Sequence, residues 1–117
     1  MTNEYGAPLD RNGYAPSIVQ ADTDERCWLC GGGAWDGLER HEIFGGRGRR
    51  EKSKRLGLWL TLCRRCHQAS PMAAHQNANT MALLHQVGQK AVMQHYGWDT
   101  NQFIIAFGKN YITEDEK

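Results

Sequence analysis

The sequence predicts a small α+β domain that is held together by a metal ion. Two Cys-x-x-Cys pairs, Cys27 with Cys30 and Cys63 with Cys66, flank a stretch that is rich in glycine and basic residues. The apolar run LGLWLTL at residues 56–62 leads into the second pair, and amphipathic segments follow it. A chain of 117 residues is expected to form one domain with a core of modest size.

The four cysteines predict a structural zinc site. Each pair places two thiolates on one tight turn, which fits one side of a tetrahedral zinc ion. Residues 1–22 lack a basic stretch followed by an apolar one, and no segment approaches the roughly 20 apolar residues of a membrane helix. We therefore expect a cytoplasmic protein without a membrane partner, in which cysteines bind metal rather than form disulfides.

The N-terminal residues and the domain that follows them are expected to differ in how well ordered they are. Residues 1–24 contain Gly, Pro, Asn and Asp with few large apolar side chains, which predicts a flexible or extended arm. Residues 25–117 form the domain, with a metal-binding core at 25–76 and C-terminal helices at 79–112. In the core, GGRGRREKSKR is predicted to be a loop, residues 56–62 a buried strand, and the residues after Cys66 a short helical turn ended by Pro71.

Two helices are predicted after residue 79. Thr80 can cap a helix over residues 81–96, with Gly97 at its C-terminal end. Asp99, with Gln102 three residues later, resembles a capping box for a second helix. The expected buried face of the second helix consists of Phe103, Ile104 and Phe107.

The charge is distributed unevenly along the chain. The net charge is +1, yet nine of the 14 basic residues and only two of the 13 acidic residues lie between Arg40 and His67. That segment carries +7 and the rest of the chain −6. A local basic field indicates a polyanion site such as nucleic acid, although a solvated loop is the alternative. The candidate phosphate contacts are Arg47, Arg49, Arg50, Lys52, Lys54, Arg55, Arg64 and Arg65.

Three histidines lie close to the cysteine pairs. His41 falls between the two pairs, His67 follows Cys66 directly, and His75 comes eight residues later. If His41 lies on a strand and His67 on a helix, the two can face each other beside the basic segment. Imidazole with carboxylate suits a divalent ion that keeps open positions for water and phosphate. His85 and His95 are expected to be ordinary helix residues.

Several motifs together resemble those of the HNH endonucleases. The matching pieces are HEIFGGRGRREKS, LGLWLTLCRRCH, AHQN, TMALLHQVGQKA, GW and FGKNY, which span roughly residues 27–112. They are similar to a phage and prophage subfamily with the motifs HHIFGG, LCxxCH and FGKNY. The resemblance implies a ββα-metal, treble-clef fold in which a hairpin and a helix hold one divalent ion, Mg²⁺ or Mn²⁺. It also implies a phage or prophage origin.

The resemblance assigns roles to particular residues. It implies that His41 and His67 are ligands of the catalytic ion, with His75 as a further ligand or a phosphate contact. Glu42 occupies the position of the general base, where the family has histidine, and Leu58 replaces the middle asparagine. A shift of one residue would make His41 the base and place Arg40 at the ligand position, but arginine cannot bind a metal ion. A glutamate has a reference pKa of about 4.3, against about 6.5 for histidine, and is the weaker base.

Three functions follow from these observations. The first is a metal-dependent DNA endonuclease of low sequence specificity. The second is a nuclease-derived factor that has lost catalysis at Glu42 and binds DNA or a protein, as an inhibitor or recombination accessory. The third is a zinc-stapled interaction module for which the basic segment is irrelevant.

Overall fold

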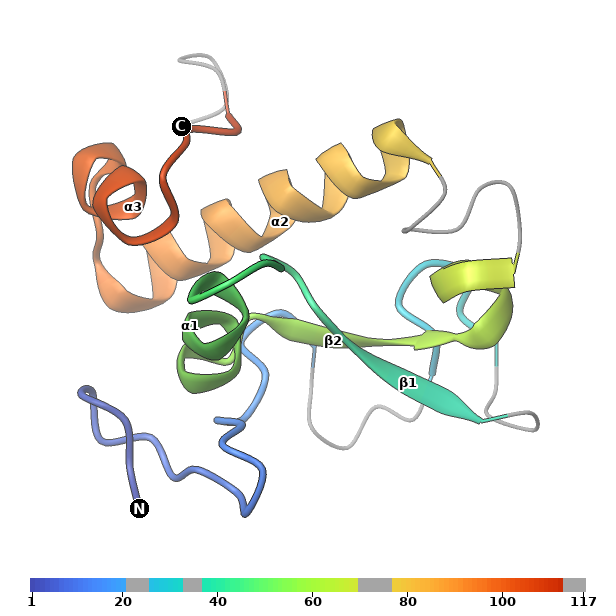
Figure 1. Cartoon of the computed structure of the whole chain (residues 1–117), viewed down its shortest axis with the longest axis horizontal. Coiled ribbons are helices and arrows are strands. Elements are labelled where there is room, and N and C mark those ends of the chain that lie inside the picture. The colour runs from blue at the N-terminus through green and yellow to red at the C-terminus, as the bar shows by residue number, and fades with distance from the viewer. Residues whose placement is uncertain (21–25, 33–36, 70–76, 113–117) are drawn as a thin grey trace.

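A computed structural model of the chain describes residues 1–20, 26–32, 37–69 and 77–112 (Figure 1). The elements follow one another as β1 (Leu38–Glu42), α1 (Arg49–Leu56), β2 (Trp59–Cys63), a π-type turn η1 (Arg65–Ala69), α2 (Ala78–Tyr96) and α3 (Thr100–Phe107). The predicted α+β class is confirmed. None of the helices in these ranges has the length and apolar character that crossing a membrane requires.

The two strands pair antiparallel and form a hairpin whose connection contains α1. His41 of β1 lies opposite Leu60 of β2. Leu60 and Leu62 are fully buried, as the apolar run predicted. The strand begins at Trp59 rather than at residue 56. The reason is Gly57, whose left-handed backbone (φ 77°) turns the chain between α1 and β2.

Helix α1 corrects the prediction of a loop over residues 45–55. Only residues 45–48 remain as a loop, because lysine, arginine and glutamate after them favour a helix. The buried Ser53 fastens this helix to the end of β1: its hydroxyl accepts from the Phe44 amide at 3.1 Å and donates to the Phe44 carbonyl at 2.9 Å. Ser53 thereby positions the loop that connects β1 to α1.

Helix α2 begins two residues before the predicted cap. Asn77 is the N-cap, and its side chain accepts a hydrogen bond from the Thr80 amide at 3.0 Å. The prediction that Thr80 caps the helix is therefore wrong. Asparagine is among the strongest N-cap residues, so the helix starts at the earlier site. The predicted end at Gly97 is confirmed, with φ 72°.

Helix α3 carries the predicted capping box. Asp99 accepts from the Gln102 amide, and the Gln102 side chain accepts from the Asp99 amide. Phe103 and Phe107 are buried, but Ile104 is 37% exposed and does not belong to the buried face. The two phenylalanines pack against Phe44, so α3 closes the core behind the end of β1.

Gly88 brings α2 close to the end of β1. A Cβ atom at this position would lie 2.7 Å from Cγ2 of Ile43 and 3.0 Å from the ring of Phe44. The adjacent Gln89 is fully buried and donates to the Asn110 side chain at 2.8 Å. The side-chain oxygen of Gln89 accepts a hydrogen bond of 2.7 Å from the Tyr111 amide, so the residues after α3 are hydrogen-bonded to α2.

Residues 1–20 run along α1, β2 and the end of α2. The Asn3 side chain donates to the Arg55 carbonyl at 2.6 Å, and the Trp59 indole donates to the Ala15 carbonyl at 2.8 Å. The Tyr5 ring stacks on Tyr96 with a centroid distance of 4.3 Å. Within this segment the chain folds back on itself, since Thr2 pairs with Pro8 in an antiparallel bridge.

Candidate functional site

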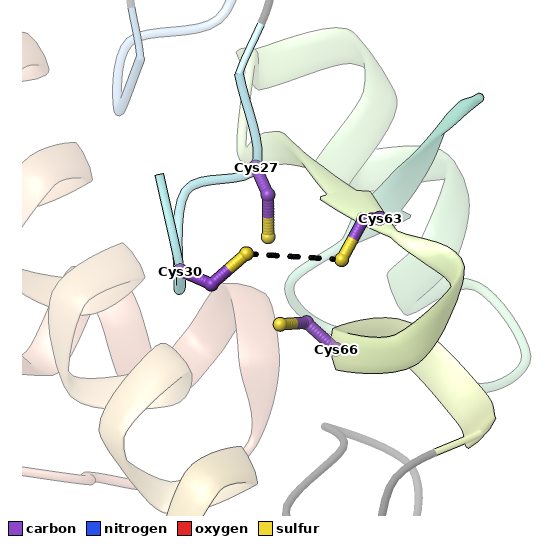
Figure 2. A group of neighbouring side chains, drawn as sticks. All are labelled: Cys27, Cys30, Cys63 and Cys66. Atoms are coloured by element: carbon purple, nitrogen blue, oxygen red, sulfur yellow. Dashed lines mark hydrogen bonds between the residues drawn. The ribbon is translucent and has the colours of Figure 1, made fainter. Parts of the chain in front are cut away.

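The four cysteines meet at one point of the fold (Figure 2). Their sulfur atoms all lie within 4.8 Å of one another, and the sulfurs of Cys30 and Cys63 are 3.8 Å apart. A tetrahedron of thiolates with bonds of about 2.3 Å to zinc has edges of about 3.8 Å. The chain therefore positions four cysteines to bind a metal ion, consistent with a structural metal such as zinc.

Two separate parts of the chain supply these ligands. Cys27 and Cys30 lie on a turn that is closed by a hydrogen bond of 2.8 Å from the Gly31 amide to the Cys27 carbonyl. Gly31 has φ 71°, a conformation that favours glycine. Cys63 ends β2 and Cys66 lies in η1. A bound metal would therefore join the turn to the hairpin.

The thiol pKa values within the cluster move in opposite directions. Burial, reinforced by the neighbouring thiols, raises the pKa of Cys66. Burial acts in the same direction on Cys27, but hydrogen bonds with the backbone of Cys30, Cys63 and Leu29 outweigh it and lower the pKa of Cys27 to about 7. Because four adjacent thiolates repel one another, they need a cation to ionise together. This chemistry suits a divalent metal ion.

His41 and His67 face each other beside the cysteine cluster. Both side chains are buried, with 2% and 9% exposure, and their ring centroids are 5.2 Å apart at an interplanar angle of 78°. Nδ1 of His67 lies 2.9 Å from Oε1 of Glu39, so a carboxylate orients the ring of His67. The structure thus brings the strand histidine and the helical histidine together, as the sequence predicted.

Their role as metal ligands stays a prediction. His75, the third histidine of the predicted set, lies outside the described residues. Among the residues that the structure describes, the cysteines form the one group of three or more ligand side chains close enough to share an ion. His41 and His67 contribute two adjacent imidazole rings, and Glu39 contacts the ring of His67.

Glu42 has a partner in the N-terminal segment. Along β1, Arg40 and Glu42 alternate with Glu39 and His41, so their side chains leave the opposite face of the strand. Oε1 of Glu42 accepts a hydrogen bond of 2.9 Å from the Tyr14 hydroxyl. Burial, together with this bond and the charge of Glu42, raises the pKa of Tyr14 to about 12.

Arg40 lies on the same face as Glu42. Its guanidinium stacks over the rings of Tyr14 and Trp59, at 4.4 Å and 4.7 Å from their centroids, and forms an ion pair with Asp10 at 3.0 Å. These contacts hold Arg40 away from His67. The alternative register, with Arg40 at the ligand position, therefore has no support in the geometry.

A pocket of about 170 Å³ lies where the end of β1, the start of α1 and α2 meet. The residues that line it include His41, Glu42, Phe44, Arg49, His85 and Tyr111. The ring of His85 packs against Phe44 and Tyr111, at centroid distances of 5.3 Å and 4.5 Å. His85 was expected to be an ordinary helix residue, and no sequence pattern marks it, because only the packing of α2 brings it beside His41.

The basic residues fall into two groups. Arg47 and the residues of α1 lie at one end of β2, whereas Arg64 and Arg65 follow its other end (Figure 1). Three side chains of the first group have partners within the chain: Lys52 donates to the Ala106 carbonyl, Lys54 pairs with Glu51, and Arg55 pairs with Glu4. Arg47, Arg49 and Arg50 are exposed at or just before the start of α1, and Arg49 also lines the pocket.

We compared the chain with models of known protein families, with curated proteins and with solved structures, and none of them matches. The resemblance to HNH endonucleases therefore rests on the sequence motifs alone. The geometry of the cysteines, His41 and His67 stands independently of that resemblance.

Proposed function

We propose that the protein is a metal-dependent endonuclease that hydrolyses phosphodiester bonds in DNA, built on the ββα-metal plan of the HNH enzymes. The observation that carries this proposal is the meeting of His41 and His67 beside the four-cysteine cluster. His41 comes from the hairpin and His67 from the helical turn after it. In this proposal the cysteines hold a structural zinc ion, since a closed site of four thiolates has no open position for catalysis.

The donor atoms at His41 and His67 fit a second divalent ion. A carboxylate behind a ligating histidine is the usual support for such a ligand, and Glu39 supplies it to His67. Two imidazole ligands favour Mn²⁺ or another transition metal over Mg²⁺, which prefers oxygen. Such an ion stabilises negative charge on the departing 3′ oxygen of the substrate.

The exposed arginines supply contacts to the DNA backbone. Arg47, Arg49 and Arg50 lie at the start of α1, and Arg49 lines the pocket beside His41. Contacts of this kind place a duplex without reading its sequence. Low sequence specificity is therefore part of the proposal.

Cleavage of a supercoiled plasmid with Mg²⁺, Mn²⁺ and Ni²⁺ tests the proposed function. We expect nicking in at least one of these ions, with a loss of roughly 100-fold or more in His41→Ala and in His67→Ala. His95→Ala is the matched control, since His95 is exposed on α2. Clean protein with metal-loaded cysteines that leaves the plasmid intact in every ion would rule out the endonuclease.

One observation favours a second function. The hydrogen bond from Tyr14 holds the Glu42 carboxylate on the face opposite His41, as expected if Glu42 no longer serves catalysis. The chain would then be a nuclease-derived factor that binds DNA or a protein. Salt-sensitive DNA binding without cleavage would support this function, as would cleavage that appears only in Glu42→His.

A further inference from the structure

We propose that His85 of α2, rather than Glu42 of β1, accepts the proton of the attacking water in the pocket beside His41. This inference rests on the proposed endonuclease function and names the proton acceptor of that same site. The motifs of the sequence place the base at residue 42, whereas the tertiary structure brings a histidine from a distant helix to the same pocket.

The ring of His85 packs against two aromatic side chains, Phe44 and Tyr111, at centroid distances of 5.3 Å and 4.5 Å. In a neutral imidazole one nitrogen donates and the second accepts. The second nitrogen of His85 belongs to a ring that lines the pocket.

Glu42 also lines the pocket, but its carboxylate has a partner. Oε1 of Glu42 accepts a hydrogen bond of 2.9 Å from Tyr14, on the face of β1 that carries Arg40. To act as the base, the carboxylate would have to give up this hydrogen bond. His85 needs no such rearrangement.

The same pocket has a place for the phosphate. Arg49 lines it from the first residue of α1, whose N-cap Gly48 makes no side-chain cap. The guanidinium of Arg49 lies against Gly108 at the end of α3, and a guanidinium favours a phosphate group. The volume of about 170 Å³ is well above the roughly 10–15 Å³ that one water needs, so the pocket has room for a phosphate oxygen and a water.

The step is a hydrolysis in which His85 acts as general base. As the water oxygen bonds to phosphorus, one water proton passes to the second nitrogen of His85. The bond from phosphorus to the 3′ oxygen breaks, that oxygen keeps the electron pair, and it takes a proton from solvent. The imidazolium then returns its proton to solvent. Burial lowers the pKa of His85 below 6.5, so the ring is neutral and ready to accept near pH 7.

Three matched variants test the proposal by plasmid cleavage at neutral pH. We expect His85→Gln to lose about 10²- to 10⁴-fold in rate, the usual contribution of a general base. His95→Gln should stay within about tenfold of wild type, and Glu42→Gln should lose less rate than His85→Gln. Added imidazole should restore part of the rate in His85→Ala, which a purely structural role of His85 would not allow. Thermal unfolding and metal content, measured on each variant, confirm that it folds.

A second readout does not depend on cleavage. Inorganic phosphate added to the full chain should shift the NMR signals of the His85 ring and leave those of His95 unchanged, and Arg49→Ala should abolish the shift. Cleavage by wild type together with full activity of His85→Gln would overturn the proposal and leave the endonuclease function intact. A His85 ring that ignores phosphate would also overturn it. A wild-type protein that cuts no DNA in any ion would instead remove the proposed function, and the role of His85 with it.

Discussion

At the scale of single residues, Tyr14 and Glu42 show how a distant partner changes what a side chain can do. They are 28 residues apart in the sequence, yet their hydroxyl and carboxylate are 2.9 Å apart. Glu42 lies at the position where the motif predicts a base, and Tyr14 occupies one of its two carboxylate oxygens. The same contact holds the N-terminal segment against the hairpin.

This contact makes stability depend on alkaline pH. An unfolded tyrosine ionises near pH 10, whereas burial and Glu42 raise the pKa of folded Tyr14 to about 12. The stabilisation is therefore complete below about pH 10 and is lost as the pH rises from 10 to 12. We expect the free energy of unfolding to fall more across this window in wild type than in Tyr14→Phe. Denaturant titration at several pH values measures this difference.

Glu42→Gln is the control for this measurement. It removes the charge that favours protonated Tyr14, so its loss of stability over the same window should lie between those of wild type and Tyr14→Phe. Tyr96, whose pKa is also raised by burial, is present in all three proteins and cancels in the comparison. Identical pH dependence in all three would show that Tyr14 and Glu42 do not interact in solution.

At the scale of elements, the close packing of α2 on the end of β1 depends on Gly88. No side chain fits there, because a Cβ would meet Ile43 and Phe44. The same approach brings His85, one helical turn earlier, against Phe44 and Tyr111. The packing of this helix therefore shapes the pocket.

Gly88→Ala should destabilise the protein despite the higher helix propensity of alanine. Overpacking of a core usually costs about 1–3 kcal/mol, which exceeds the gain of roughly 1 kcal/mol from replacing a helical glycine. Chemical denaturation measures the difference. Lys90→Ala, at an exposed position of the same helix, should change stability by less than about 0.5 kcal/mol. A stabilised Gly88→Ala would mean that α2 lies further from β1.

The turn at residues 27–32 is joined to the hairpin and η1 through the cysteines, so its position should depend on the metal. We expect purified protein to contain one zinc ion for each chain. Removing it with a strong chelator should expose reactive thiols and lower the unfolding temperature, because the binding free energy of a structural metal contributes to folding. Metal analysis and circular dichroism measure both effects.

Cys63→Ser and Cys66→Ser should behave like chelated wild type, and added Zn²⁺ should restore the unfolding temperature of the wild-type protein only. Mg²⁺, which prefers oxygen ligands, should not restore the unfolding temperature of wild type or of either variant. A chain that contains no metal, and whose stability the chelator leaves unchanged, would contradict a structural metal site.

At the scale of the whole molecule, only some of the basic residues that make the sequence uneven in charge are available to a binding partner. Lys52, Lys54 and Arg55 interact within the chain, whereas Arg64 and Arg65 lie at the other end of β2 from α1. The exposed arginines that remain around the start of α1 are Arg47, Arg49 and Arg50.

The salt dependence of DNA binding distinguishes these groups. Each phosphate contact adds about 0.9 to the slope of log affinity against log salt concentration. The double variant of Arg47→Ala and Arg50→Ala should reduce the slope by about 2. The double variant of Lys52→Ala and Arg55→Ala removes the same charge but should reduce it by less than about 1. Fluorescence anisotropy with a short duplex measures both, and equal reductions would show that net charge alone governs binding.

The sequence by itself determined the features that depend on short spacings. The two Cys-x-x-Cys pairs, the capping box of Asp99 and Gln102, and the end of α2 at Gly97 each rest on residues within a few positions, whose local geometry is nearly independent of the rest of the chain. The loop predicted over α1 and the cap predicted at Thr80 failed where two local signals competed.

The sequence predicted that His41 can face His67, but the tertiary structure alone decided two other meetings of distant side chains. Tyr14 with Glu42, and His85 with Phe44 and Tyr111, are separated by many residues. Their approach depends on how the hairpin, the N-terminal segment and α2 pack around a shared core. No periodicity or motif encodes that packing, which is why the motif places the base at Glu42 whereas we propose His85.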